Sequence, residues 1–499
     1  MKTVLYLAGI LFCLSNLNAQ QTQINISVDK RKSEIELLEK AFLNLHPGIY
    51  RYNSRAQING YFDELKRRIA GNITGREYFI LLSQLTEKIK CGHTYLNPWN
   101  QKKEVRQDYF STSFFPLLFR VINHRFIVTH NLSENADILP GDEIININNI
   151  PAKAIFDSLW TVSRADGNNG RGKKTDNMNL MPIDIDSESY AMFDVFFPLF
   201  FPKNLNVSSY QIGIKSYHGK SGERIVKALS KQERQKVYIE KFGEIPLHEK
   251  NWEFKFLQPK TGYLKIGDFE TWEWKTDYKK YLDRIFNVLD SANVSNLIID
   301  IRGNEGGDDE ARNELLAHVL NKPFGCDNPT RKLYHFLNIP DDIMPYVSSW
   351  NKEVKKPKEE RLYIKTKDSL YEQIGENYRT CKPINPKSSV FKGKVFLLTD
   401  ANNSSTTFTL ADFFQKAERG VIIGEQTGGT KQGLNGGQFL FLQLPYSKIE
   451  VDIPVIWQRP TYARPDEGVK PDFKVATTQK DIAIHNDPQL SFALQLIEE

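Results

Sequence analysis

Short apolar segments alternate with helix-forming segments through the second half of this chain of 499 residues. Residues 262–266, 297–301 and 395–399 are runs of mainly apolar residues, which predict buried strands. Apolar residues recur at helical spacing in residues 278–289 and 309–320, between those strands. Strands separated by helices favour a largely parallel sheet that helices cover, because parallel strands need a crossover connection. This half of the chain is therefore predicted to fold as an α/β layer.

The first residues are typical of a segment that is removed during export. Lys2 supplies a basic charge, residues 4–14 are apolar, and Ala19 offers a small residue at the cleavage position. Residues 1–19 are therefore predicted to be a signal peptide, and their apolar run is too short to cross a bilayer. We expect an exported protein, periplasmic or extracellular, with no integral membrane segment after the signal is removed.

Composition excludes some other classes of protein. The formal net charge of +5 is small for this length, and Lys and Arg are interspersed with Asp and Glu, so no nucleic-acid footprint is present. Removal of the signal leaves Cys91, Cys326 and Cys381, which allow at most one internal disulfide. Cys326 with Cys381 is the favoured pair, and no zinc-type spacing of Cys and His occurs.

The first half of the chain shows two sequence patterns, one helical and one of strands and turns. Amphipathic stripes between residues 30 and 88 predict an N-terminal helical unit, placed at residues 20–110. In residues 111–165 a Pro-Gly-Asp turn precedes an Ile-rich strand and an Asn-Asn turn, which resembles the pattern of PDZ domains. PDZ domains bind extended peptide ends at a sheet edge. Residues 166–255 are left as a connecting region, with strands expected near residues 210–214 and an aromatic cluster, 193–201, that favours core over a lid.

Ser405 stands where the predicted strand 395–399 passes into a helix that ends near Gly420. Backbone N–H groups are unsatisfied at a helix N-terminus, and the helix dipole favours negative charge there. A nucleophilic hydroxyl that generates an oxyanion needs this setting. Taken alone, however, Ser404 or Ser405 is better explained as a helix cap.

Polar turns follow or flank the other predicted strands of this half. These turns occupy residues 300–307 (Asp-Ile-Arg-Gly-Asn-Glu-Gly-Gly), 424–429 (Gly-Glu-Gln-Thr-Gly-Gly) and 466–472 (Asp-Glu-Gly-Val-Lys-Pro-Asp). Together with Ser405, and in this order, they resemble the core of the tail-specific (C-terminal processing) serine peptidases. Residues 91–94, Cys-Gly-His-Thr, match that family's Asp-Gly-His-Thr signature at all but the first position. The resemblance implies a crotonase-like α/β core, placed at residues 256–499, with an N-terminal helical unit and an inserted PDZ-like domain.

The same resemblance implies roles for individual residues. The strand end 398–400 aligns the nucleophile with Ser405, and the oxyanion donors would be the backbone N–H groups of Gly306, Gly307 and Thr406. One branch of the family takes its general base from a lysine after the Gly-Glu-x-Thr-x-Gly motif, but here Lys431 lies one place late. The branch that contains the tricorn core protease uses a histidine and a glutamate, which match His93 and Glu467. We therefore predict a triad of Ser405, His93 and Glu467.

These motifs predict an exported serine endopeptidase that acts on proteins or peptides and recognises substrate C-termini through its PDZ-like domain. Cys91 is interpreted as a small buried residue in place of Asp rather than as a nucleophile. No metal or organic cofactor is implied. Two alternatives remain open at this point, a non-catalytic binding module on the same fold and hydrolysis of a non-peptide acyl compound.

Overall fold

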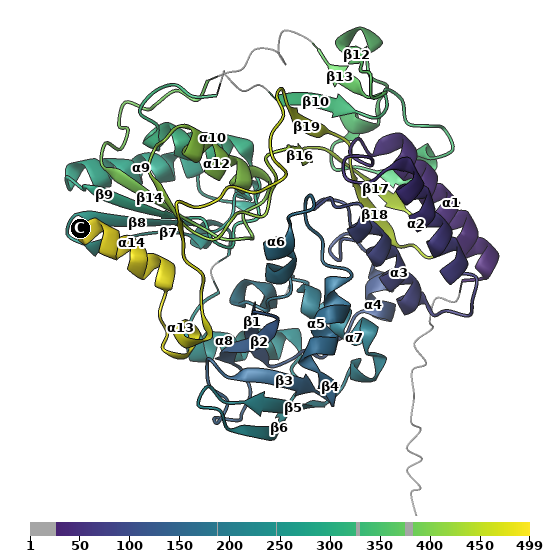
Figure 1. The fold of residues 1–499 in the computed structure, drawn as a ribbon, viewed down its shortest axis with the longest axis horizontal. Coiled ribbons are helices and arrows are strands. Elements are labelled where there is room, and N and C mark those ends of the chain that lie inside the picture. The colour runs from purple at the N-terminus through teal and green to yellow at the C-terminus, as the bar shows by residue number, and fades with distance from the viewer. Residues whose placement is uncertain (1–25, 187, 246, 326–329, 375–382) are drawn as a thin grey trace, which may run out of the picture.

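The chain is built around a sheet with the strand order β20-β15-β14-β9-β8-β7 (Figure 1). The computed structural model describes residues 26–186, 188–245, 247–325, 330–374 and 383–499. The strands of the central sheet are β7 (Trp252–Gln258), β8 (Thr261–Ile266), β9 (Asn296–Asp300), β14 (Lys394–Thr399), β15 (Val421–Gly424) and β20 (Phe473–Lys474). All neighbours are parallel except β7, which pairs antiparallel with β8.

Helices cover both faces of this sheet, as the continuous apolar runs of its strands require. Helices α9 (Tyr278–Ser291), α10 (Asp309–Val319) and α12 (Ser405–Lys416) pack on one face. Helix α14 (Pro488–Glu498) packs on the other. Neighbouring residues of β9 divide between the two layers, because Leu297 joins the first core and Ile298 the second. The predicted mixed α/β fold is confirmed.

The N-terminal unit is helical, as predicted, and it packs against strands from the distant second half of the chain. Its helices are α1 (Val28–Leu45), α2 (Arg55–Arg68), α3 (Gly75–Lys88) and α4 (Lys103–Tyr109). Two smaller sheets lie outside the central sheet and are formed by residues 330–373 and 434–460. Their strand orders are β12-β13-β10-β19-β16 and β11-β17-β18. The apolar side chains of β17 and β18 share a core with the N-terminal helices. Sequence analysis did not predict this pairing of distant segments.

The strands of these two smaller sheets are short. They are β10 (Thr330–Tyr334), β11 (Val347–Ser348), β12 (Tyr363–Lys365), β13 (Tyr371–Gln373), β16 (Leu434–Asn435), β17 (Phe439–Gln443), β18 (Glu450–Pro454) and β19 (Trp457–Pro460). Most of their pairing is between residues far apart in sequence, such as β10 with β19 and β11 with β17.

A further β unit lies between the helical unit and the central sheet in the sequence. Its sheet has the order β1-β2-β3-β5-β6, with β4 paired to β3. The strands are β1 (Leu117–Ile122), β2 (Arg125–Asn131), β3 (Glu143–Ile147), β4 (Ile150–Pro151), β5 (Ser209–Lys215) and β6 (Ser221–Lys227). The turn between β3 and β4 has positive φ at Asn148 and Asn149, 49° and 63°, as a tight hairpin requires.

This β unit is longer than the predicted range 111–165. Strands β5 and β6 come from the segment that sequence analysis left as a connector. The strand expected near residues 210–214 corresponds to β5, whereas β6 was not predicted because its apolar alternation is weak, and the pairing of β5 with the distant β3 leaves no local signal. The helices of the unit are α5 (Ala152–Trp160), α6 (Arg171–Asp176), α7 (Met192–Phe200) and α8 (Lys231–Phe242). The aromatic cluster 193–201 falls on α7, whose side chains are mostly buried core, as favoured.

Other expectations lie partly or wholly outside the described residues. The predicted signal peptide and both Cys326 and Cys381 fall there. Within the described ranges, no helix combines the length and apolar composition needed to cross a bilayer. A short helix, α13 (Gln479–Ala483), precedes α14 at the end of the chain.

A buried ion pair joins two helices of the β unit. The Arg234 guanidinium, which has no exposed surface, donates to both carboxylate oxygens of Asp194 at 3.1 and 2.6 Å. The pair links α8 to α7 inside the aromatic core, where an unpaired charge would be costly.

We predict that Arg234→Ala lowers the free energy of unfolding by about 3 to 5 kcal/mol, because it leaves the buried Asp194 carboxylate uncompensated. Urea denaturation followed by tryptophan fluorescence measures the change. Lys236→Ala is the matched control on the same helix, since Lys236 forms an exposed pair with Glu240 at 3.8 Å. Equal stabilities of the two variants would contradict the prediction.

Candidate active site

The carboxyl ends of three adjacent parallel strands bring the predicted motifs together. Asp300 of β9 pairs with Leu398 of β14, and Thr399 pairs with Gly424 of β15. The turns that begin at these residues therefore emerge from one edge of the sheet. Ligands of open α/β sheets bind at this edge.

Side chains lock the turn after β9 to the turn after β14. The Asp400 carboxylate accepts a hydrogen bond from the Gly303 N–H at 2.8 Å. Asn403, fully buried, donates to the carbonyls of Ile301 at 2.5 Å and Asn304 at 3.2 Å. These bonds fix the backbone on both sides of Ser405 and of the glycine pair.

Ser405 begins helix α12 in a strained conformation. Its φ of 50° lies in the left-handed region, which is uncommon for a residue other than glycine and recurs at functional sites. Among the described residues, its Oγ has no hydrogen-bond partner. Ser404 does not cap the helix with its side chain, because its Oγ donates to the Glu305 carbonyl at 3.1 Å. The capping explanation for this pair of serines therefore fails.

The glycine pair is packed directly against Ser405. A Cβ atom at Gly306 would lie 2.8 Å from Ser405 Cβ and 3.2 Å from the Thr406 nitrogen. Thr406 Oγ1 donates to the Gly307 carbonyl at 2.8 Å, which holds the start of α12 on this turn. Only a residue without a side chain allows this approach.

The predicted oxyanion donors differ in their availability. The Gly306 N–H donates to Asn304 Oδ1 at 2.9 Å, so of the three predicted donors this one is already engaged. The N–H groups of Gly307 and Thr406 make no hydrogen bond to another described residue. Gly307 and Thr406 remain the predicted donors, and Gly306 provides the space beside Ser405.

The turn after β15 connects to the C-terminal motif. The Thr427 N–H donates to the Val469 carbonyl at 3.1 Å, and the Val469 N–H donates to Thr427 Oγ1 at 2.8 Å. The Gly428 N–H donates to the Asn403 carbonyl at 2.9 Å. All the motifs of the second half therefore meet around Ser405.

The residues Asp300 and Arg302 of the first motif have a structural role. The Arg302 guanidinium pairs with Asp300 at 2.6 Å and with Asp487 at 2.7 Å. The Tyr263 hydroxyl also donates to Asp300 at 2.7 Å. This cluster fastens the segment before α14 to the end of β9.

His93 comes from the N-terminal unit and lies against the chain at the start of β17. A Cβ atom at Gly436 would lie 3.6 Å from its Cε1, and the Phe439 ring is 5.7 Å from the imidazole ring. His93 Nδ1 is buried with no hydrogen-bond partner among the described residues. Burial lowers the pKa of His93, and the Asp166 carboxylate opposes this as the largest single charge effect. Within the described residues, no hydrogen bond joins His93 to Ser405.

Charged residues that sequence analysis missed surround His93. Asp166 accepts a hydrogen bond from the Gly92 N–H at 2.9 Å, next to the histidine. Lys173, almost fully buried, pairs with Glu305 at 2.8 Å and donates to Asn402 Oδ1 at 3.1 Å. The Glu305 carboxylate also raises the pKa of His93. Asp166 and Lys173 fall in the predicted connector, where no local pattern marks them, whereas Glu305 stands inside a motif.

Glu467, the predicted acidic member, lies at the C-terminal motif. Its carboxylate pairs with Lys470 at 2.5 Å and with Lys431 at 3.6 Å, and the hydrogen bond from Lys470 leads the lowering of its pKa. Within the described part of the chain it makes no ion pair or hydrogen bond with His93. Lys431, the rival base, is therefore paired with the glutamate of the predicted triad.

Cys91 is buried, as interpreted from the sequence. Its Sγ accepts a hydrogen bond from Asn435 Nδ2 at 3.4 Å, and burial raises the pKa of the thiol. A thiol with a raised pKa is a poor nucleophile near neutral pH.

Aromatic side chains continue from His93 towards the solvent. Trp350, 73% exposed, packs on Phe439 at 5.8 Å and on Phe441 at 4.7 Å between ring centroids. Phe439 in turn contacts the His93 ring. The site therefore has an apolar wall on the side of His93.

Comparison with known proteins finds a matching peptidase family model and similar solved structures. The model of peptidase family S41 matches residues 260–475. The structure of mature CPAF complexed with lactacystin is similar at a TM-score of 0.63 and 12% identity, covering 94% of this chain and 97% of that one. Mature CPAF alone is similar at a TM-score of 0.58 and 12% identity, covering 94% and 96%. A search of curated proteins found no match.

Residues 260–475 therefore match the S41 peptidase family, in line with the predicted resemblance to the tail-specific peptidases. The likeness to the CPAF structures extends over nearly the whole chain and shows that the fold is shared.

We predict that Gly306→Ala reduces the rate at which a serine-directed probe acylates the protein by about 10²-fold, because the new Cβ displaces Ser405. Gly303→Ala is the control. Its φ of 80° carries a similar backbone strain, but a Cβ there meets no atom within 4 Å. The measurement is the second-order rate constant of labelling for both variants. Equal rates would show that close packing at Gly306 does not position Ser405.

Proposed function

We propose that this protein is an exported serine endopeptidase that hydrolyses peptide bonds through an acyl-enzyme on Ser405. The observation that carries the proposal is the strained Ser405 at the N-terminus of α12, packed against the Gly306-Gly307 turn with two backbone N–H donors left over. A helix N-terminus with unpaired N–H groups is the setting that stabilises an oxyanion. The match of residues 260–475 to a peptidase family model supports the same chemistry.

In the proposed reaction, Ser405 Oγ attacks the scissile carbonyl while His93 accepts the serine proton. The N–H groups of Gly307 and Thr406 bind the oxyanion of the tetrahedral intermediate. His93 then protonates the leaving amine, and water hydrolyses the acyl-enzyme by the same steps. A neutral imidazole is needed for the first step, and burial, which lowers the pKa of His93, favours that form.

The acidic partner of His93 has two candidates. Sequence analysis predicts Glu467, whose carboxylate is paired with lysines. Asp166 is the carboxylate with the largest effect on the pKa of His93. A small movement on substrate binding is common in such sites, so both carboxylates enter the test below.

The substrate side of the proposal rests on two features. The aromatic wall of Trp350, Phe439 and Phe441 suits apolar side chains of an extended peptide. Recognition of a substrate C-terminus by the β unit remains a prediction. At the outer edge of β1, Phe119 already exchanges two backbone hydrogen bonds with Leu180, each 3.0 Å long. A peptide added at that edge would have to displace Leu180.

Ser405→Ala is expected to abolish peptide hydrolysis and labelling by a fluorophosphonate probe, because the hydroxyl is the proposed nucleophile. Ser404→Ala should retain most activity, since its Oγ only donates to the Glu305 carbonyl. Digestion of a denatured protein substrate and peptide mapping of the labelled chain measure both effects. An active, unlabelled wild type would favour a non-serine mechanism, and an inactive, unlabelled one would favour a binding module.

His93→Ala is expected to reduce kcat/KM by about 10²- to 10⁴-fold or more, as for loss of a general base. Lys431→Ala should change it little, because Lys431 is paired with Glu467. The assay compares kcat/KM of both variants on one substrate. If Lys431→Ala is the inactive variant, the protein uses a lysine base instead.

Glu467→Gln and Asp166→Asn then identify the acidic partner by the pH profile. Asp166 raises the pKa of His93, so its removal lowers that pKa further and moves the acid limb of kcat/KM to lower pH. Glu467→Gln should reduce kcat/KM if it orients the imidazole, as predicted. A larger loss with Asp166→Asn, together with the shifted limb, would assign the role to Asp166.

A further inference from the structure

A buried histidine far along the chain from the proposed catalytic residues has no hydrogen-bond partner. His318 on α10 has no exposed surface, and its ring stacks on Phe286 of α9 at 4.4 Å. Neither Nδ1 nor Nε2 makes a hydrogen bond to any described residue. A buried imidazole without a hydrogen-bond partner costs desolvation free energy. A ligand that binds the lone pair of the ring would offset this cost.

Two carboxylates face the free nitrogen. Nε2 lies 3.3 Å from Asp283 Oδ1 and 3.8 Å from Glu314 Oε1. Glu314 stands one helical turn before His318, so both side chains share a face of α10, and Asp283 reaches them from α9. Asp283, Glu314 and His318 therefore form a cluster of potential metal ligands within the described part of the chain.

The separations of these atoms suit a tetrahedral metal ion. With ligand bonds of about 2.0 to 2.2 Å, the ligand atoms of a tetrahedral zinc site lie about 3.3 to 3.6 Å apart. The distances of 3.3 and 3.8 Å from Nε2 require only small side-chain movements to reach that arrangement. One imidazole with two carboxylates is also a donor set that zinc accepts, with a further position for water.

The Lys387 ammonium would compete with a metal ion for the two carboxylates. Its Nζ lies 2.5 Å from Glu314 Oε1 and 3.5 Å from Asp283 Oδ1, so the ammonium balances the carboxylate charge. It makes no hydrogen bond with His318 among the described residues, so the Lys387 ammonium does not satisfy the imidazole. The Lys387 side chain is one-third exposed and can turn into the solvent, which leaves its place to a divalent ion.

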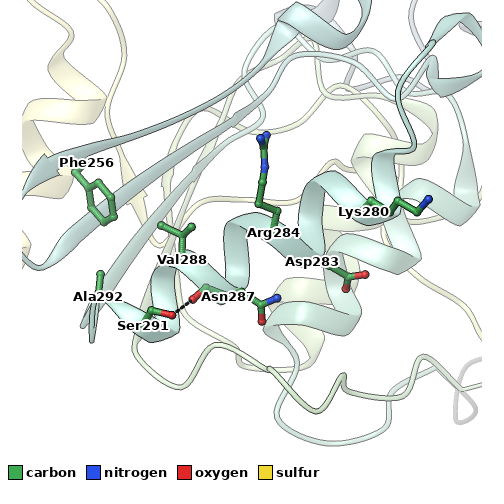
Figure 2. A pocket seen from close by; sticks show the side chains of 8 residues that line it. All are labelled: Phe256, Lys280, Asp283, Arg284, Asn287, Val288, Ser291 and Ala292. Atoms are coloured by element: carbon green, nitrogen blue, oxygen red, sulfur yellow. Dashed lines mark hydrogen bonds between the residues drawn. The ribbon is translucent and has the colours of Figure 1, made fainter.

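The cluster is reachable from the surface. Asp283 also lines an open groove on the outer face of α9, together with Phe256 of β7 and the neighbouring side chains Lys280 and Arg284 (Figure 2). Asp283 is itself half-exposed. An ion can therefore enter from this side without opening the core.

We propose that Asp283, Glu314 and His318 bind a divalent cation of the zinc class, in competition with the Lys387 ammonium. The bound ion ties α9 to α10. Helix α10 begins at Asp309, shortly after the Gly306-Gly307 turn, so the ion stabilises the layer from which that turn projects. This role is independent of the proposed peptidase reaction and uses none of its residues.

Titration of the tag-free protein with Co²⁺ and Zn²⁺ tests the site. Four-coordinate Co²⁺ gives an intense visible absorption, and isothermal calorimetry gives the Zn²⁺ affinity and stoichiometry. Lys387→Met is expected to bind both ions at least about tenfold more tightly, because it removes the competitor, and the ions should raise its Tm. Glu314→Gln and Asp283→Asn should each weaken binding by about ten- to a hundredfold.

Glu310→Gln is the control, since Glu310 is an exposed carboxylate on the same helix. It should bind Co²⁺ like the wild type. His318→Gln is a further variant, but the carboxylate variants decide the question if it fails to fold. The proposal is overturned if Lys387→Met gains no affinity, or if Glu314→Gln binds as tightly as Glu310→Gln.

Discussion

The interlock between the turns after β9 and β14 is the contact on which the site depends. Asn403 is its centre, because its amide bonds two carbonyls of the first turn while its own Oδ1 accepts from the Asp400 N–H at 2.9 Å. Thr407 Oγ1 adds a bond to Asn304 Oδ1, the same oxygen that holds the Gly306 N–H. These groups are buried, so an unmade bond would cost more than the bond itself contributes. The position of Ser405 against the glycine pair therefore follows from a closed hydrogen-bond network rather than from packing alone.

The N-terminal unit is attached to the second half of the chain through strand β18. The Asp452 N–H donates to the Tyr95 carbonyl at 3.0 Å, and the Asp452 carboxyl accepts from Asn97 and Asn100. Gln101 exchanges hydrogen bonds with Glu450 at 2.8 and 3.0 Å. The loop that carries His93 is thus attached to a segment that follows Ser405 in sequence. Helix packing alone would leave such a loop mobile, whereas these bonds fix its register.

Local patterns were enough to predict the middle of the central sheet but not its edges or the contacts between distant segments. Strands β8, β9 and β14 and helices α9, α10 and α12 follow from apolar periodicity, whereas the edge strands β7 and β20 and helix α14 were not predicted. Strand β6 was missed because it is largely exposed at a sheet edge and has few apolar residues to mark it. Lys173 and Asp166 were missed for a related reason. Their roles depend on Glu305 and Gly92, which only the folded chain brings near. The use of the Gly306 N–H by Asn304 is likewise invisible in a sequence motif.

The charges around His93 explain why burial determines its protonation. Asp166 and Glu305 raise its pKa, whereas Arg164 and Lys173 lower it. Both bases stand near Glu305, since Lys173 pairs with it and the Arg164 guanidinium lies 3.9 Å from the same carboxylate. Opposite charges at similar range largely cancel in their effect on a third group. The main remaining effect on the pKa of His93 is the cost of placing a charged imidazole away from water, which favours the neutral ring. In the proposed reaction a neutral imidazole is the form of His93 that can accept the serine proton.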